Sequence, residues 1–259
     1  MLELDRVSFS YGPKVVADAV SISVAPGELV ALLGSNGAGK STLLRIASGI
    51  LAPSSGRVTL SGRDVGSYSA RGLALRRAFL EQDSSVAFDC RVIDAVLLGR
   101  YAYGNFSAGR DDMRFARASL AEVGLAGFED RLLTSLSGGE RRRVMLARVL
   151  AQLARDGSCE GSVLLLDEPS AGLDPAHAHG AMSAARRLAD RGAAVLAVLH
   201  DPNLAAQYAE KIAFLKGGRM LGVHSASGAM RAELLEDAYG APCRIISDGI
   251  SDFALFLRK

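Results

Sequence analysis

The sequence predicts an α/β protein built around a mainly parallel sheet. Residues 29–33 and 163–166 form continuous apolar runs of strand length, the pattern of strands that are buried on both faces of such a sheet. Runs of this kind alternate along the chain with segments that have a helical spacing of apolar residues, as in βαβ units. Glycine is abundant, at 28 of 259 residues, which favours sites lined by backbone atoms.

The expected elements of the α/β part follow one another in order. Apolar residues that alternate with polar ones predict two strands within the first thirty residues. The run at 29–33 ends in a glycine-rich turn, after which a helix over 40–47 and a short strand at 57–60 are expected. The later elements are strands at 162–167 and 193–199, a helix over 175–191 between them, and further alternation through 204–209, 212–215 and 220–223.

The stretch from 84 to 159 has a different pattern, and only helices are expected in it. Apolar residues recur at helical spacing from 113 to 123, and Gly124 follows as a stop signal. Ser137 is followed three residues later by Glu140, the pattern of a capping box that opens a helix. We therefore expect one domain over 1–259, in which 1–83 and 160–259 form the α/β core and 84–159 a helical insertion.

Composition excludes several classes of protein. The chain has 30 Lys and Arg against 28 Asp and Glu, so its net charge of +2 gives no electrostatic case for binding nucleic acid. The mean hydropathy is +0.19, yet no apolar run approaches the roughly 18–20 residues that span a bilayer. The first residues carry no apolar signal core, and three cysteines lie far apart, so we expect no export and no disulfide framework.

A phosphate-binding loop is the first functional motif. The sequence GSNGAGKS at 34–41 matches the pattern G-x-x-x-x-G-K-[ST], and it lies between a buried strand and a helix, as that pattern requires. Lys40 should reach the β- and γ-phosphates of a nucleotide, and the Ser41 hydroxyl should bind Mg²⁺. A chance glycine-rich turn is the alternative, and both flanking elements argue against it. The residues expected to bind nucleotide here are Gly34, Ser35, Asn36, Gly37, Ala38, Gly39, Lys40, Ser41 and Thr42.

Polar residues at two other strand ends complete the predicted site. Asp167 ends the buried run at 163–167, where ligands bind in open α/β sheets, and suits a contact with Mg²⁺. Glu168 follows at once and could polarise an attacking water. Solvated acids at a strand end are the alternative. His200 follows the run at 193–199, where a catalytic and a purely structural histidine are both possible, and Gln82 could bring an amide to the metal.

The motif LSGGE at 136–140 resembles the signature of ATP-binding cassette (ABC) ATPases, and the other motifs occur in that family's order. This resemblance implies a P-loop NTPase fold: a RecA-like core with an antiparallel β edge and an inserted helical subdomain. It also implies ATP and Mg²⁺ as bound groups, with Ser41, Gln82 and Asp167 at the metal. The further implied roles are adenine stacking for Tyr11, catalysis for Gln82, Glu168 and His200, a D-loop at Asp174, and contact with the ATP of a second copy for Ser137, Gly138 and Gly139.

The subtype follows from weaker resemblances. Residues 80–100 and 234–243 are similar to ATPases of iron-chelate, cobalamin and haem importers, and the extra stretch at 151–161 is typical of haem importers. Glu81, Cys90 and Ser170 depart from the usual pattern. The resemblance implies a head-to-tail dimer bound to two integral-membrane permease subunits, and indirectly to a periplasmic binding protein, at the cytoplasmic face of the inner membrane. The function that this resemblance implies is ATP hydrolysis that powers the import of haem. Ferric siderophore or cobalamin import, and a non-transport ABC ATPase, remain alternatives.

Three further features of the sequence have mainly structural interpretations. The basic triplet 141–143 is expected to be mostly a solvated helix face rather than a nucleic-acid patch. His177 and His179 are two apart on a predicted helix and therefore make poor joint ligands. The aromatic residues between 101 and 106 pack locally or, as we hypothesise for 84–106 as a whole, line the groove that receives a helix of the membrane subunit.

Overall fold

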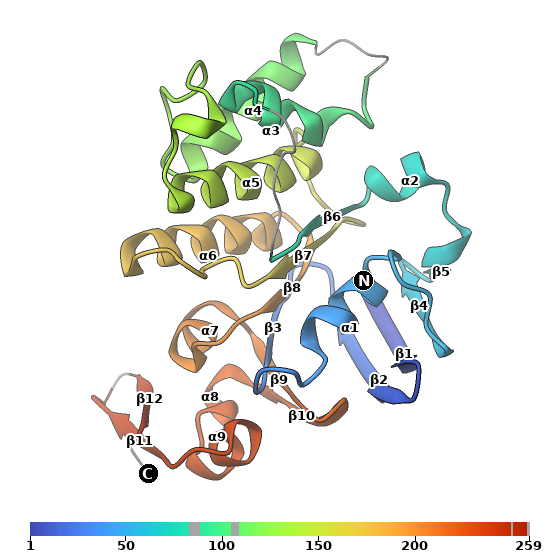
Figure 1. Cartoon of the computed structure of the whole chain (residues 1–259), viewed down its shortest axis with the longest axis vertical. Coiled ribbons are helices and arrows are strands. Elements are labelled where there is room, and N and C mark those ends of the chain that lie inside the picture. The colour runs from blue at the N-terminus through green and yellow to red at the C-terminus, as the bar shows by residue number, and fades with distance from the viewer. Residues whose placement is uncertain (83–88, 105–108, 250, 258–259) are drawn as a thin grey trace.

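The computed structural model describes residues 1–82, 89–104, 109–249 and 251–257. A six-stranded β-sheet lies at the centre of the fold (Figure 1). Its strand order is β10-β9-β3-β8-β7-β6, and all neighbours are parallel except β9 and β10. The strands are β3 (Leu29–Leu33), β6 (Arg77–Leu80), β7 (Val163–Asp167), β8 (Ala194–Val198), β9 (Lys211–Lys216) and β10 (Arg219–Ser225). The mainly parallel sheet expected from the sequence is therefore present.

The continuous apolar runs belong to strands covered on both faces. Every residue of β3 is fully buried, and successive side chains pack into two different hydrophobic clusters. Leu29 and Leu33 join a cluster with the helices, whereas Val30 and Leu32 join a cluster with the antiparallel sheet. Because side chains alternate across a strand, only a sequence that is apolar at every position can bury both faces.

An antiparallel sheet and α1 (Lys40–Ala47) cover one face of the central sheet (Figure 1). This second sheet has the order β2-β1-β4-β5, and in β1 the apolar residues Leu2, Leu4 and Val7 are buried. Its strands are β1 (Leu2–Tyr11), β2 (Lys14–Val24), β4 (Ser55–Leu60) and β5 (Arg63–Asp64). The antiparallel edge implied by the resemblance is thus present as a sheet of its own.

Helices cover the opposite face, and those between β6 and β7 gather at one end of the molecule (Figure 1). Buried residues of these helices belong to the same cluster as Leu29, Leu164 and Val195 of the central sheet. The helical insertion therefore shares a continuous core with the α/β part, and the boundaries at 83/84 and 159/160 stay predictions. The helices are α3 (Val92–Leu97), α4 (Arg110–Glu122), α5 (Gly138–Leu153), α6 (Pro175–Asp190) and α7 (Pro202–Tyr208).

The predicted capping box opens α5. The Ser137 hydroxyl accepts a hydrogen bond from the Glu140 amide at 3.2 Å, and the Glu140 carboxylate accepts one from the Ser137 amide at 2.7 Å. This reciprocal pair satisfies two amides at the start of the helix that would otherwise lack partners. The helix consequently begins directly after Ser137, which fixes the LSGGE motif at its N-terminus.

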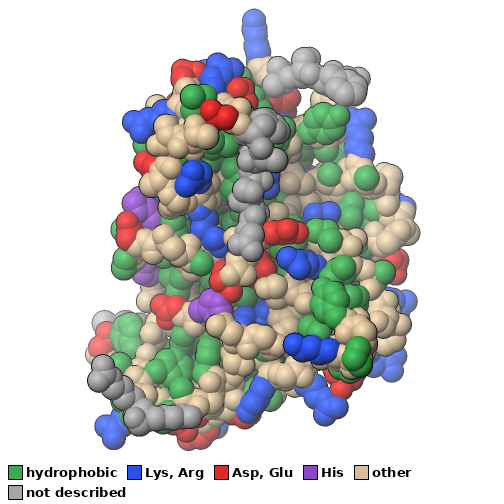
Figure 2. All heavy atoms as spheres, viewed as in Figure 1, with side chains coloured by type: hydrophobic (Ala, Val, Ile, Leu, Met, Phe, Trp, Pro, Cys, Tyr) green, Lys and Arg blue, Asp and Glu red, His purple; other side chains and the backbone are tan. Residues whose placement is uncertain are grey.

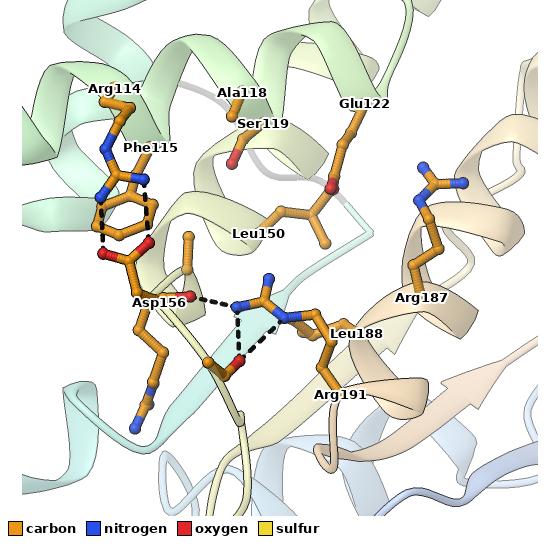
Figure 3. Close-up of a pocket in the computed structure, with 13 residues that line it drawn as sticks. Arg114, Phe115, Ala118, Ser119, Glu122, Leu150, Asp156, Arg187, Leu188 and Arg191 are labelled. Carbon is orange, nitrogen blue, oxygen red and sulfur yellow. Dashed lines mark hydrogen bonds and ion pairs between the residues drawn. The ribbon is translucent and has the colours of Figure 1, made fainter.

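The stretch at 151–161 begins as the end of α5 and continues as a loop that side chains of neighbouring helices hold in place. Helix α5 runs on to Leu153, so only the residues after it form the link to β7. The Arg191 guanidinium donates to the carbonyls of Arg155 and Gly157, and Arg114 of α4 makes a two-pronged ion pair with Asp156 at 3.0 and 2.8 Å (Figure 3). These residues line a cleft between α4 and α6.

The sequence patterns do not predict several short elements, none of which is longer than eight residues. They are the 3₁₀ turns Val65–Ser67, Leu98–Arg100 and Leu133–Ser135, the helices α2 (Ala70–Ala74), α8 (Ala226–Ala229) and α9 (Ala232–Tyr239), and the C-terminal hairpin of β11 (Cys243–Ser247) and β12 (Asp252–Phe256). Among the described residues, the helices are all too short or too polar to cross a bilayer. On the described part of the face in Figure 2, basic and acidic side chains intermingle without an extended patch of one sign.

Two glycines give a test of the close packing within the helical insertion. A Cβ at Gly99 would lie 2.2 Å from the Arg148 carbonyl oxygen of α5, whereas one at Gly180 within α6 would meet no described atom within 4 Å. We expect Gly99→Ala to lower the free energy of unfolding by about 1–3 kcal/mol through overpacking. Gly180→Ala should raise it by about 0.5–1 kcal/mol, because alanine restricts the unfolded chain. Urea denaturation of both variants would measure this, and equal effects would contradict the close contact.

Candidate functional site

The phosphate-binding loop at 34–41 connects β3 to α1 through backbone conformations that favour glycine. Gly34 and Gly39 have φ values of +147° and +104°. A Cβ would lie 2.1 Å from the Leu215 carbonyl oxygen at Gly34, and 2.3 Å from that of Val16 at Gly39. Both positions therefore exclude a side chain, and the loop can curl so that its amides face a common centre. The centre lies at the N-terminus of α1, where the helix dipole favours an anion.

Lys40 lies over this loop and is only 6% exposed. Its ammonium donates hydrogen bonds to the carbonyl oxygens of Gly34 at 2.7 Å and Ser35 at 2.9 Å. Burial lowers the pKa of Lys40, and the nearby carboxylates of Glu168 and Asp167 oppose that shift. The side chain thus holds a positive charge against the loop, within reach of a phosphate bound there.

Ser41 and Asp167 place two oxygen groups side by side beneath the loop. The Ser41 hydroxyl donates to Asp167 Oδ1 at 3.1 Å, and Asp167 is only 2% exposed. Burial is the main cause that raises the pKa of Asp167, and the hydrogen bond from Ser41 partly opposes it. A buried carboxylate next to a hydroxyl is a donor set that suits Mg²⁺, since the cation offsets the cost of the buried charge.

Glu168 meets His200 and Gln82 at the rim of the same site. Its carboxylate forms an ion pair with His200 Nε2 and accepts a hydrogen bond from the Gln82 amide at 3.2 Å. The Glu168 backbone has a φ of +52°, in the left-handed region that non-glycine residues seldom occupy. This turn directly after β7 redirects the Glu168 side chain toward its neighbours, and strain of this kind clusters at functional sites.

These residues surround one open cleft of about 620 Å³, a size typical of small-molecule sites. Of the residues predicted from the sequence, the cleft is lined by Tyr11, Asn36, Gly37, Ala38, Gly39, Lys40, Ser41, Thr42, Gln82, Glu168 and His200. Tyr11 is 49% exposed and contacts the Phe9 ring edge-on, with 4.9 Å between the ring centroids. Ser35 and Gly34 touch the site through their carbonyls, and Asp167 through Ser41.

Five residues of this cleft are not predicted by any motif in the sequence. They are Lys14, Val15 and Val16 at the start of β2, and Gly217 and Gly218 in the turn between β9 and β10. The Gly218 amide donates to the Ala38 carbonyl of the loop at 3.0 Å. No motif marks these positions, because tertiary contacts between two sheets bring them to the loop. The ladder that places β9 beside β3 brings Gly217 and Gly218 near the loop, whereas Lys14, Val15 and Val16 belong to the other sheet.

The signature residues and Asp174 lie outside this cleft but near one another. A Cβ at Gly139 would be 3.4 Å from the Leu173 side chain and 3.7 Å from the Gly172 carbonyl oxygen. Asp174 caps α6: it accepts hydrogen bonds from the His177 amide at 2.9 Å and pairs with the His177 ring at 2.7 Å, and these bonds lower the pKa of Asp174. Ser137 and Gly138 are exposed. The structure thus separates the predicted nucleotide residues into two surfaces of one chain.

The family model described as "ABC transporter" matches residues 17–171, a span that includes the loop, Gln82, the LSGGE motif and Glu168. The chain belongs to the ABC transporter family. Its cleft is accordingly that of an ATP-binding domain, in agreement with the resemblance found in the sequence.

Similar proteins and structures of this ABC chain agree with that assignment. It is 42% identical to the hemin import ATP-binding protein HmuV of Gloeobacter violaceus over 93% of this chain and 87% of that protein. It is 45% identical to the protein of the same name from Bradyrhizobium diazoefficiens, over 92% and 88%. Among solved structures, a metal-chelate type ABC transporter in an inward-facing conformation superposes with a TM-score of 0.79 at 26% identity, over 99% of this chain and 96% of that one. A dimeric bacterial ABC transporter cassette gives 0.77 at 25% identity, over 88% and 100%.

The buried carboxylate of Asp167, which suits Mg²⁺, is expected to lower the stability of the fold when no metal is bound. Because burial raises its pKa above the unfolded value, ionised Asp167 destabilises the fold at neutral pH. Asp167→Asn should keep the hydrogen bond from Ser41 and, without Mg²⁺, raise the melting temperature at pH 7 by about 2 °C or more. This advantage should shrink as pH falls through the raised pKa, where the wild-type carboxyl becomes protonated.

Thermal unfolding with and without Mg²⁺ measures this effect. Asp130→Asn is the control, because its side chain is 89% exposed and its charge carries little burial cost. We expect no measurable shift for the control. A lower melting temperature for Asp167→Asn than for the wild type at pH 7 without Mg²⁺ would contradict the electrostatic account.

Proposed function

We propose that this chain is the ATP-hydrolysing subunit of an importer that carries hemin across the inner membrane. The observation that carries the proposal is the convergence of Lys40, Ser41, Asp167 and Glu168 at one cleft. This convergence occurs in an ABC chain 39–45% identical over most of its length to several proteins named hemin import ATP-binding proteins.

The geometry supports hydrolysis by an activated water. Loop amides and the Lys40 ammonium would hold the β- and γ-phosphates, and Tyr11 at the lip of the cleft would stack on the adenine. Ser41, Gln82 and Asp167 would hold Mg²⁺, which neutralises charge on the phosphate oxygens. Glu168 would accept a proton from water as its oxygen attacks the γ-phosphorus and the bond to the β-phosphate oxygen breaks, giving ADP and phosphate. His200, paired with Glu168, would contact the γ-phosphate.

A second copy would complete each site. The exposed residues Ser137 and Gly138 lie at the N-terminus of the 16-residue helix α5, where amides and the helix dipole attract an anion. In a head-to-tail dimer they and Gly139 would close over the ATP held by the partner's loop, with Asp174 nearby. ATP can bridge two such surfaces better than ADP and free phosphate, so binding would close the dimer and hydrolysis would open it.

Attachment to the membrane would come from other chains. We assign two integral-membrane permease subunits and, through them, a periplasmic binding protein as partners, with this chain peripheral on the cytoplasmic face. The candidate groove for a permease helix includes Leu98 and Tyr101, which are 44% and 66% exposed. Of the segment 84–106 in that hypothesis, residues 84–88, 105 and 106 lie outside the described residues.

Removing the proposed base tests the chemistry. Glu168→Gln should lower kcat for ATP hydrolysis at least about 10²-fold, because an amide cannot accept the proton from water. The same variant should still form a dimer with ATP and Mg²⁺, since Lys40 and Ser41 are unchanged. A phosphate-release assay and sedimentation with ATP measure the two effects. Full turnover by Glu168→Gln would reject the role of Glu168.

Reconstitution with the permease tests the cargo. In vesicles, ATP hydrolysis by the complete transporter should rise several-fold with hemin-loaded binding protein and should not respond to the unloaded protein. The same assay with ferric siderophore and with cobalamin, each on its binding protein, tests the two alternative cargoes. Stimulation by one of these and not by hemin would replace hemin as the cargo while leaving the ATPase assignment in place.

A further inference from the structure

Arg142 connects the signature helix to the catalytic rim. It lies on the second turn of α5, five residues after Ser137, and its half-buried guanidinium reaches the segments that follow β6 and β7. The Nη1 group donates to the Gln82 carbonyl oxygen at 3.0 Å. The Nη2 group donates to the carbonyl oxygens of Glu168 and, at 3.4 Å, of Asp167. One side chain therefore joins the backbones of three residues from two separate strand ends.

These bonds act on a backbone that needs support. Glu168 has a left-handed φ of +52°, a conformation that persists only where surrounding contacts hold it. Its amide donates to the Val198 carbonyl oxygen at 3.1 Å, and its own carbonyl accepts from Arg142 and from the Ala171 amide. Because a guanidinium is planar, its donors keep a fixed spacing, which suits a clamp on several carbonyl oxygens.

Arg142 and the adjacent Arg143 donate to different parts of the structure. The helical spacing of 141–143 predicts a mostly solvated face, and this prediction is wrong for two of the three residues, because only Arg141 is exposed. Arg143 is also half-buried, and it donates to the carbonyl oxygens of Val123 at 3.0 Å and Gly124 at 3.3 Å, at the end of α4. Arg143 therefore fastens one helix to another, whereas Arg142 fastens the same helix to Gln82 and Glu168.

Building on the proposed ATP hydrolysis, we propose that Arg142 is a positioning residue for that reaction. Its guanidinium holds the backbones of Gln82 and Glu168 so that their side chains meet at the cleft. It acts through these backbones, because its guanidinium donates to the carbonyl oxygens of Gln82, Asp167 and Glu168 and Arg142 does not line the cleft itself. Because α5 begins directly after Ser137, Arg142 links the helix that follows the signature loop to the Glu168 backbone of the same chain.

Steady-state kinetics of the full-length chain test this role. Arg142→Gln should lower kcat about tenfold or more, because small displacements of a reacting group cost large factors in rate. The KM for ATP should stay within about twofold of the wild type, since the phosphate loop is untouched. Arg142→Lys keeps the charge and one donor group, and should recover part of the lost kcat.

Arg143→Gln is the matched control for stability. It removes an equivalent guanidinium from the same helix, so it should lower the melting temperature comparably while leaving kcat within about twofold of the wild type. A double variant adds a second test: Arg142→Gln should lower the residual rate of Glu168→Gln far less than it lowers the wild-type rate, because residues that act through one another are not additive.

Two results would overturn the inference. One is a kcat for Arg142→Gln within twofold of the wild type. The other is an equal fall in kcat for Arg142→Gln and Arg143→Gln, which would make the effect one of general stability. By contrast, a wild-type chain that fails to hydrolyse ATP, or a Glu168→Gln variant with full turnover, would contradict the proposed function itself.

Discussion

The end of β7 is the constraint on which the site depends. The carboxylate of Asp167 is buried in the sheet and accepts a hydrogen bond from the Ser41 hydroxyl. The next residue, Glu168, has a left-handed backbone φ. The first residue places a negative charge beneath the phosphate loop, and the turn redirects the second toward His200 and Gln82. Two adjacent acids thereby take different environments, although they share one strand end.

The strand order of the central sheet brings the site residues together. Parallel β3, β8 and β7 are neighbours, so their carboxyl ends deliver the phosphate loop, His200 and the two acids to one edge of the sheet. Burial of both faces fixes the register of these strands, because a slip by one residue would exchange the two hydrophobic clusters. The helical insertion shares the same core, and Arg142 extends that rigidity to Gln82 and Glu168.

The features that the sequence predicts correctly are those set by residues close together in the chain. The phosphate loop, the capping box and the buried strands each depend on residues close together in the chain, and these predictions of structure are confirmed. Lys14, Val16 and Gly218 could not be found, since they reach the cleft only through packing of distant strands. The arginine triplet was misjudged for the same reason, because helical spacing alone does not reveal which carbonyl oxygens lie beside Arg142 and Arg143. The assigned chemical roles remain predictions.

The most direct measurement of the central claim is a crystal structure of the Glu168→Gln variant with ATP and Mg²⁺. The account predicts the γ-phosphate within hydrogen-bond distance of Lys40 Nζ and the metal beside Ser41 and Asp167. It also predicts residues 137–139 of a second copy on the same nucleotide. ATP bound away from the 34–41 loop, or held there with the metal remote from Asp167, would contradict it.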